Sequence, residues 1–260
     1  MEDMKQRHFV LVHGACHGAW CWYKVVSLLQ LAGHKVTALD LSASGVNPKQ
    51  MKDLHSISDY FDPLIEFMRS LPEEEKVIIV GHSMGGLSIS AAMERFPEKI
   101  SAGVFAAAFM PGPDLSYLAI KEEFDKEIDD KQVGVEFIYD KKIDDKSPIG
   151  FQFGPKCLSN MLYQLSPNED LVLATFCLRP FPLCGGTPNV VISKEKYGSV
   201  PRIYVVCDQD KIIPEGLQRW MIKNNPTDEV KVINGSDHMV MFSKPQELCS
   251  CLQEIAMKYM

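Results

Sequence analysis

The stretch Val77-Ile78-Ile79-Val80-Gly81-His82-Ser83-Met84-Gly85-Gly86 indicates the fold more clearly than any other part of the chain. Its first four residues are all β-branched, which predicts a short buried strand. The run from Leu87 to Phe96 has the apolar spacing of a helix and stops before Pro97, where a helix is expected to end. The stretch therefore predicts a strand that turns sharply into a helix, with a serine at the turn.

This turn carries the pattern G-x-S-x-G, which places a nucleophilic serine at a strand-to-helix junction. A serine on so sharp a turn has a strained backbone, at a cost on the order of 1–3 kcal/mol. The residues two positions away must then be small, and Gly81 and Gly85 meet this requirement. The N-terminus of the following helix offers N–H groups and a positive dipole end to an oxyanion. We predict that Ser83 is a nucleophile.

On both sides of this stretch, short apolar runs alternate with amphipathic segments. Such an alternation predicts an α/β fold with a parallel sheet covered by helices on both faces. The predicted strands are Phe9–Val12, Lys35–Leu39, Val77–Val80, Gly103–Ala107, Arg202–Val206 and Val230–Ile233. The predicted helices are Tyr23–Ala32, Ser58–Leu71, Leu87–Phe96 and Pro245–Lys258.

The pattern changes after Met110-Pro111-Gly112-Pro113. From there to about Tyr197 the chain is irregular, with charge runs and scattered aromatic residues. We interpret this region as an inserted, mainly helical cap. The predicted domains are therefore a core formed by residues 1–111 and 199–260, and a cap formed by residues 112–198.

Composition excludes several classes of function. The chain has 260 residues, and 27 basic against 34 acidic residues give a net charge of −7, which argues against nucleic-acid binding. No apolar run approaches the roughly 18 residues that span a bilayer, so no membrane association is expected. The N-terminal residues pass from charged residues straight into a predicted strand, which predicts no secretory signal and a cytoplasmic location.

The eight cysteines form no CxxC pair, and no histidine cluster has the spacing of a zinc site. We therefore expect reduced thiols and no metal. Cys249 and Cys251 are two positions apart on a predicted helix, so we do not expect both to face the core. His34 and His55 are expected at the surface.

A serine hydroxyl needs a base that takes its proton. His238 lies in a loop between a late strand and the last helix, at the same sheet edge as Ser83, and is the predicted base. An acid that orients the imidazole should follow a strand between these two residues. Asp208 and Asp210 both meet that condition, and spacing does not separate them.

The second oxyanion donor should come from the loop after the first core strand, which starts at His13 and Gly14. Gly14 lets the backbone approach the site, so the amide of Ala15 is the expected donor, with the amide of Met84 as its partner. Gly14 itself is also a predicted substrate contact. His17 has two interpretations, a contact with the substrate or a structural hydrogen bond near the neighbouring tryptophans.

The sequence resembles the plant methyl esterase branch of the α/β-hydrolases, which includes methyl salicylate esterase, polyneuridine aldehyde esterase and the hydroxynitrile lyases. The stretches that carry the resemblance are 9–20 (FVLVHGACHGAW), 32–41 (AGHKVTALDL), 81–86 (GHSMGG), 197–200 (YGSV), 210–211 (DK) and 237–239 (DHM). It covers nearly the whole chain and is weakest in the cap. The resemblance implies that Asp210 is the catalytic acid. It also implies that Phe109 and Met239 contact the substrate, together with Ala15 and Met84.

Two positions favour an esterase over a lyase within this branch. The lyases place Thr or Asn where this chain has Gly14, and several carry Lys where it has Met239. An apolar methionine cannot stabilise departing cyanide by charge. The expected reaction is Ser-His-Asp hydrolysis of a small-molecule methyl ester without a cofactor. A β-keto or β-aldehydo acid formed in this way would then lose CO2 spontaneously.

A receptor function and two substrate classes are also compatible with the sequence. Some α/β-hydrolases are hormone receptors with slow turnover, and the resemblance alone implies a homodimer. The stretch 180–188 (PFPLCGGTP) and the region 112–147 depart from the branch, so a hormone ester and a bulkier alkaloid ester suit the chain equally well.

Overall fold

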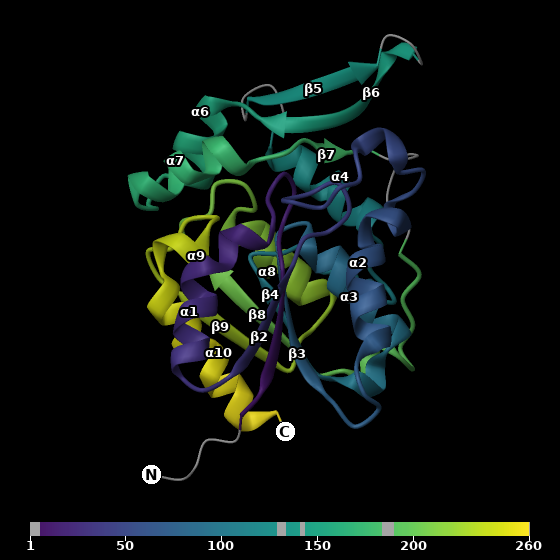
Figure 1. Ribbon diagram of the computed structural model, residues 1–260, viewed down its shortest axis with the longest axis vertical. Coiled ribbons are helices and arrows are strands. Elements are labelled where there is room, and N and C mark those ends of the chain that lie inside the picture. The colour runs from purple at the N-terminus through teal and green to yellow at the C-terminus, as the bar shows by residue number, and fades with distance from the viewer. Residues whose placement is uncertain (1–5, 129–133, 141–143, 184–189, 260) are drawn as a thin grey trace.

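The computed structural model describes residues 6–128, 134–140, 144–183 and 190–259. Its centre is a six-stranded sheet with the order β2-β1-β3-β4-β8-β9, and all neighbouring strands are parallel (Figure 1). The strands are β1 (His8–Val12), β2 (Lys35–Leu39), β3 (Val77–His82), β4 (Ile100–Ala106), β8 (Arg202–Cys207) and β9 (Glu229–Ile233). All six predicted strands are confirmed, with ends that differ by up to three residues.

Helices cover both faces of this sheet, as the sequence predicts. On one face α1 (Tyr23–Leu31) packs against α10 (Pro245–Lys258), and on the other α2 (Ile57–Ser70) packs against α3 (Gly85–Arg95) (Figure 1). The sequence pattern did not reveal α8 (Glu215–Asn224), which packs against β8, or the short α9 (Val240–Ser243).

The described residues between 112 and 183 lie above the carboxyl edge of the sheet and form the cap (Figure 1). Residues 190–201 lie beside α3 instead, where the amides of Ser193 and Tyr197 donate to the carboxylate of Glu94. The helical elements of the cap are α4 (Tyr117–Glu127), α6 (Pro155–Cys157), a π-helical turn (Leu158–Leu162) and α7 (Asn168–Cys177). The cap also contains an antiparallel sheet that the sequence pattern did not predict: β5 (Val135–Asp140), β6 (Asp144–Phe153) and β7 (Phe181–Pro182). The two longer strands carry charged residues and so lack the apolar runs that mark the core strands.

Two predictions about burial were wrong. Cys249 and Cys251 are both buried, because α10 contacts both α1 and β9. His34 is also buried, where its ring packs edge-on against Phe9 and its Nδ1 accepts a hydrogen bond from the amide of Arg7 (3.3 Å). Cys184 lies outside the described residues.

Within the described part of the chain, no helix combines the length and apolar character needed to cross a bilayer. The described residues also contain no cluster of three or more His, Cys, Asp or Glu side chains arranged to hold a metal ion.

Candidate active site

Ser83 lies at the turn between β3 and α3 and has a backbone φ of 53°, in the left-handed region that L-residues rarely adopt. The two flanking glycines are required by space. A Cβ on Gly81 would lie 2.7 Å from the carbonyl oxygen of Gly85, and a Cβ on Gly85 would lie 2.7 Å from that of His13. The structure thus shows the strained serine and the crowded glycines that the sequence pattern predicts.

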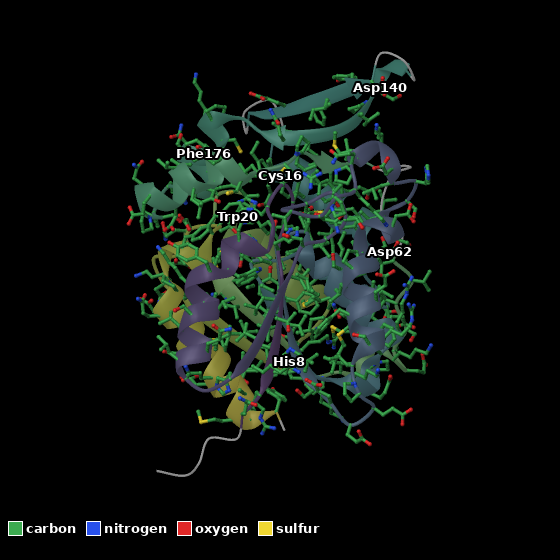
Figure 2. All side chains as sticks on the ribbon, in the orientation of Figure 1. His8, Cys16, Trp20, Asp62, Asp140 and Phe176 are labelled. Atoms are coloured by element: carbon green, nitrogen blue, oxygen red, sulfur yellow. The ribbon has the colours of Figure 1, made fainter. Side chains whose placement is uncertain are left out.

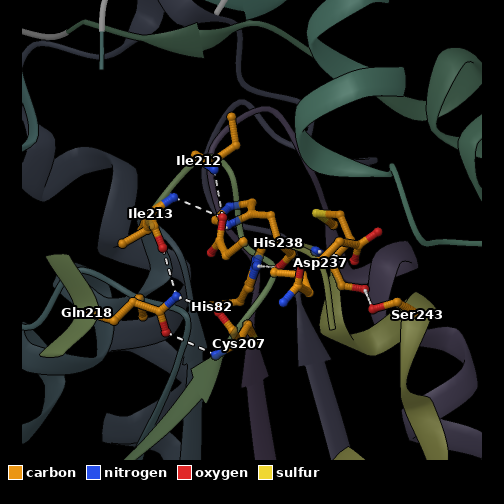
Figure 3. Close-up of polar contacts among 12 residues, drawn as sticks. His82, Cys207, Ile212, Ile213, Gln218, Asp237, His238 and Ser243 are labelled. Atoms are coloured by element: carbon orange, nitrogen blue, oxygen red, sulfur yellow. Dashed lines mark hydrogen bonds and ion pairs between the residues drawn. The ribbon is translucent and has the colours of Figure 1, made fainter. Parts of the chain in front are cut away.

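His238 and Asp210 form a buried pair at the same edge of the sheet. The distance from His238 Nδ1 to Asp210 Oδ2 is 2.7 Å, and the two side chains are 2% and 0% exposed (Figure 3). The other carboxylate oxygen of Asp210 accepts hydrogen bonds from the amides of Ile212 (2.7 Å) and Ile213 (2.9 Å). An ionised carboxylate only accepts, so Nδ1 donates, and Nε2 is left as a base.

Asp208 has a different environment. Its Oδ1 accepts from the amides of Gly235 (2.7 Å) and Ser236 (3.3 Å), so it closes the turn before the histidine. Spacing could not separate these two carboxylates, but geometry does. Only Asp210 of the two hydrogen-bonds to the imidazole of His238.

His82 connects the serine to the histidine loop. Its Nε2 donates to the carbonyl oxygen of His238 at 2.7 Å, and the two rings lie 4.6 Å apart between centroids (Figure 3). In the described part of the chain no direct hydrogen bond joins Ser83 Oγ to His238 Nε2. Catalytic hydrogen bonds of this kind are often long before substrate binds and shorten in the complex.

The amides of Ala15 and Met84 are free donors. Neither N–H group donates a hydrogen bond to another group among the described residues. Gly14 is in close contact with the serine, since a Cβ at this position would lie 2.7 Å from the Cβ of Ser83. The two amides therefore flank the nucleophile with unused hydrogen-bonding capacity.

A cavity of about 240 Å³ lies between the serine and the cap. Ala15, Ser83, Met84 and Phe109 all line it, so four predicted site residues come together there. Six phenylalanines contribute to the lining: Phe109, Phe124, Phe137, Phe151, Phe153 and Phe181. Among the described lining residues Lys121 is the one charged group, and it pairs with Asp125.

Most of the cavity wall comes from cap residues that sequence patterns did not identify. Phe151 and Phe153 alternate on β6, and Phe124 lies on α4. The alternation of aromatic residues at 151 and 153 was the available signal, but three residues are too few to distinguish a strand from a loop.

Three predicted substrate contacts lie outside the cavity lining. Gly14 lies against Ser83 but is not among the residues that line the cavity. Met239 is buried, and its amide donates to Asp237 (3.0 Å). His17 is 1% exposed, and both ring nitrogens are used internally, one with the carbonyl of Ala15 (2.8 Å) and the other with the hydroxyl of Tyr163 (2.7 Å). For His17 the geometry thus supports the structural interpretation and contradicts the prediction of a substrate contact.

Burial also sets the charge of the histidines around the site. It lowers the pKa of His17 to about 3 and lowers the pKa of His82 well below its ordinary value. Both rings are therefore neutral at neutral pH. This agrees with their contacts, because each ring donates one hydrogen bond to a backbone carbonyl oxygen.

Comparison with known proteins places this chain in a family. The model of the "Alpha/beta hydrolase family" matches residues 9–250. Methyl jasmonate esterase 1 of Vitis vinifera is 54% identical over 260 residues, which cover 99% of each chain. The structure of tomato methylketone synthase I complexed with 2-tridecanone is 47% identical, with a TM-score of 0.92 and coverage of 98% of this chain and 99% of that one.

The structure of polyneuridine aldehyde esterase is 42% identical, has a TM-score of 0.90, and covers 97% of this chain and 100% of that one. These matches extend over the core and the cap alike. The chain belongs to the α/β-hydrolase family, in the branch of the plant methylesterases and polyneuridine aldehyde esterase.

Proposed function

We propose that this protein is a serine carboxylesterase that hydrolyses methyl esters of small apolar plant metabolites. The observation that carries the proposal is the buried His238–Asp210 pair at the same edge of the sheet as a serine with a left-handed backbone. The 54% identity to a methyl jasmonate esterase and 45% identity to Arabidopsis thaliana methylesterase 1 support the ester class.

The proposed mechanism follows from the roles that these groups can take. His238 Nε2 removes the proton of Ser83, whose Oγ attacks the ester carbonyl carbon. The amides of Ala15 and Met84 donate to the oxyanion, and each donor contributes about 3–4 kcal/mol to transition-state stabilisation. The imidazolium gives its proton to the leaving methoxide. Water, deprotonated by His238, then attacks the acyl-enzyme and releases the acid.

The cavity supports an apolar acyl group. Its wall of phenylalanines contacts rings and alkyl chains well, and a volume of about 240 Å³ suits a small molecule. A jasmonate ester is the substrate class named for the Vitis vinifera relative, and polyneuridine aldehyde esterase represents the alkaloid class. We propose that the ester of this protein belongs to one of these two classes.

The test is methanol release from a panel of methyl jasmonate, methyl salicylate, methyl indole-3-acetate and an alkaloid methyl ester. We expect multiple turnovers with at least one ester, and none with Ser83→Ala. A single turnover followed by a stable complex would instead support a receptor, and cyanide release from a cyanohydrin would support a lyase.

Two further proposals rest on sequence or resemblance alone. A cytoplasmic location is tested by fractionation of tagged protein. A homodimer is tested by light scattering at several protein concentrations.

A further inference from the structure

Tyr163 of the cap contacts the loop that carries the Ala15 amide through one intermediate side chain. The Tyr163 hydroxyl lies 2.7 Å from His17 Nε2, and His17 Nδ1 lies 2.8 Å from the carbonyl oxygen of Ala15. Tyr163 and His17 are 3% and 1% exposed. Their rings stack, with centroids 6.0 Å apart and planes 21° apart.

The direction of each hydrogen bond in this chain of contacts is fixed. The carbonyl oxygen of Ala15 can only accept, so His17 Nδ1 carries the proton and donates. In the neutral ring Nε2 is then an acceptor, and the Tyr163 hydroxyl must donate to it. Burial keeps the ring neutral by lowering the pKa of His17 to about 3, and it keeps the hydroxyl protonated by raising the pKa of Tyr163.

The two peptide planes on either side of Ala15 are each held by a histidine. His13 Nε2 accepts from the amide of Leu41 (3.1 Å), so His13 Nδ1 donates to the carbonyl of Gly14 (2.8 Å). Because a trans peptide is planar, fixing that carbonyl fixes the Ala15 N–H in the opposite direction. His17 holds the next plane through the Ala15 carbonyl.

The loop needs such support because its backbone is strained. Cys16 has a φ of 64°, a left-handed conformation that costs a non-glycine residue about 1–2 kcal/mol. The cap also contacts Cys16 directly, and Figure 2 labels this residue between cap and core. The carbonyl oxygen of Cys16 accepts a hydrogen bond from the amide of Arg179 (3.0 Å), and the Sγ of Cys16 lies 3.5 Å from the carbonyl oxygen of Phe151.

The cap residues that directly follow Tyr163 contact the loops that carry the catalytic acid and the catalytic base. The Gln164 amide group donates to the carbonyl of Gln209 (2.7 Å), next to Asp210. The amide of Leu165 and the hydroxyl of Ser166 both donate to Asp237 (2.9 Å each), next to His238. Residues 163–166 thus join the cap to the oxyanion, acid and base loops.

We propose that Tyr163 and His17 are positioning residues that hold the Ala15 amide in place for the oxyanion, so that a correctly seated cap is required for full transition-state stabilisation. This rests on the proposed esterase function. His17 acts through Ala15, and Tyr163 acts through His17, so neither touches the substrate.

Tyr163→Phe tests the proposal, because it removes the donor and keeps the stacked ring. Tyr197→Phe is the matched control: it also removes a buried hydroxyl, one that lies 3.1 Å from Asn225 Nδ2 and away from the Ala15 loop. For a methyl ester we expect Tyr163→Phe to lower kcat about tenfold with little change in KM, because a misplaced donor weakens the transition state and not the substrate complex. The pH at which kcat falls on the acid side of its pH profile should be the same in Tyr163→Phe as in the wild type. A kcat within twofold of the Tyr197→Phe value would overturn the proposal.

Two measurements keep the proposal separate from folding and from the methyl-ester assignment. The ¹⁵N spectrum of the wild-type protein should show His17 protonated at Nδ1 and bare at Nε2; the opposite tautomer would overturn the proposal even if Tyr163→Phe fails to fold. If no methyl ester is cleaved, the rate of Ser83 labelling by an alkyl fluorophosphonate replaces kcat. It should fall about tenfold in Tyr163→Phe and stay unchanged in Tyr197→Phe.

Discussion

The carboxylates of Asp208 and Asp210 are two residues apart in sequence and hydrogen-bond to different parts of the molecule. Asp210 reaches the imidazole of His238 at 2.7 Å, whereas Asp208 accepts from the turn amides of Gly235 and Ser236. One carboxylate therefore orients the base, and the other shapes the loop that presents it.

We accordingly expect Asp210→Asn to lower kcat by about 10²–10⁴-fold, because an amide in place of the carboxylate favours the wrong imidazole tautomer and cannot stabilise the imidazolium. Asp208→Asn keeps an acceptor for the turn amides and should lower kcat less than about tenfold. Steady-state kinetics of ester hydrolysis by the two variants measure both changes in kcat. Equal losses would contradict the assignment of the acid.

The core and the nucleophile could be predicted from sequence because each has a local cause. The β-branched run before Ser83 and the glycines around it act within a few residues, and the structure shows a strand and a left-handed serine there. The choice between Asp208 and Asp210 depends on where a distant loop folds back, which spacing cannot reveal. The cap sheet escaped prediction for a similar reason, since Phe151 and Phe153 face a cavity that exists only after the chain has folded.

Ser83→Gly should be more stable than Ser83→Ala by about 1 kcal/mol, while both variants are inactive. Ser83 has a φ of 53°, which glycine adopts freely and alanine does not. The larger conformational freedom of glycine in the unfolded chain offsets part of the gain. Urea unfolding of the two variants measures the difference. An alanine variant as stable as the glycine variant would show that the turn relaxes without strain.

Gly14→Ala should reduce hydrolysis by at least about tenfold. The added methyl group would lie 2.7 Å from the Cβ of Ser83, so either the serine or the Ala15 amide must shift. Gly198→Ala is the control, because its nearest neighbour would lie 3.7 Å away. Initial rates with a methyl ester compare the two. Unchanged activity in Gly14→Ala would mean that the loop yields without affecting the oxyanion site.

Phe124→Ala should raise KM for an apolar methyl ester by about tenfold and change kcat less. Phe124 lines the cavity from α4, and losing its contact with the acyl group removes about 1.4 kcal/mol of apolar burial, which corresponds to a factor of ten. Phe176→Ala is the control, since that ring is 82% exposed (Figure 2). A KM that responds equally to both substitutions would place the acyl group elsewhere.

The buried neutral histidines should make the protein lose stability as the pH falls below about 6.5. Burial depresses the pKa of His17 from 6.5 to about 3, so the unfolded chain binds a proton that the folded chain excludes. The stabilisation is therefore complete above pH 6.5 and is lost as the pH falls from there toward 3. Between pH 7.5 and 5.5 this residue alone accounts for about 1.4 kcal/mol of unfolding free energy. Urea unfolding at these two pH values measures it.

His17→Asn isolates this effect from the other titrating groups, because asparagine does not titrate. Its unfolding free energy should fall by about 1.4 kcal/mol less than that of the wild type over the same pH interval. The pKa values of His13 and His82 are lowered by burial as well, so some acid sensitivity should remain in the variant. An identical pH dependence of the unfolding free energy in the two proteins would mean that His17 takes up a proton in the folded state. A doubly protonated ring could still donate to the carbonyl of Ala15, but it could not accept a hydrogen bond from the hydroxyl of Tyr163.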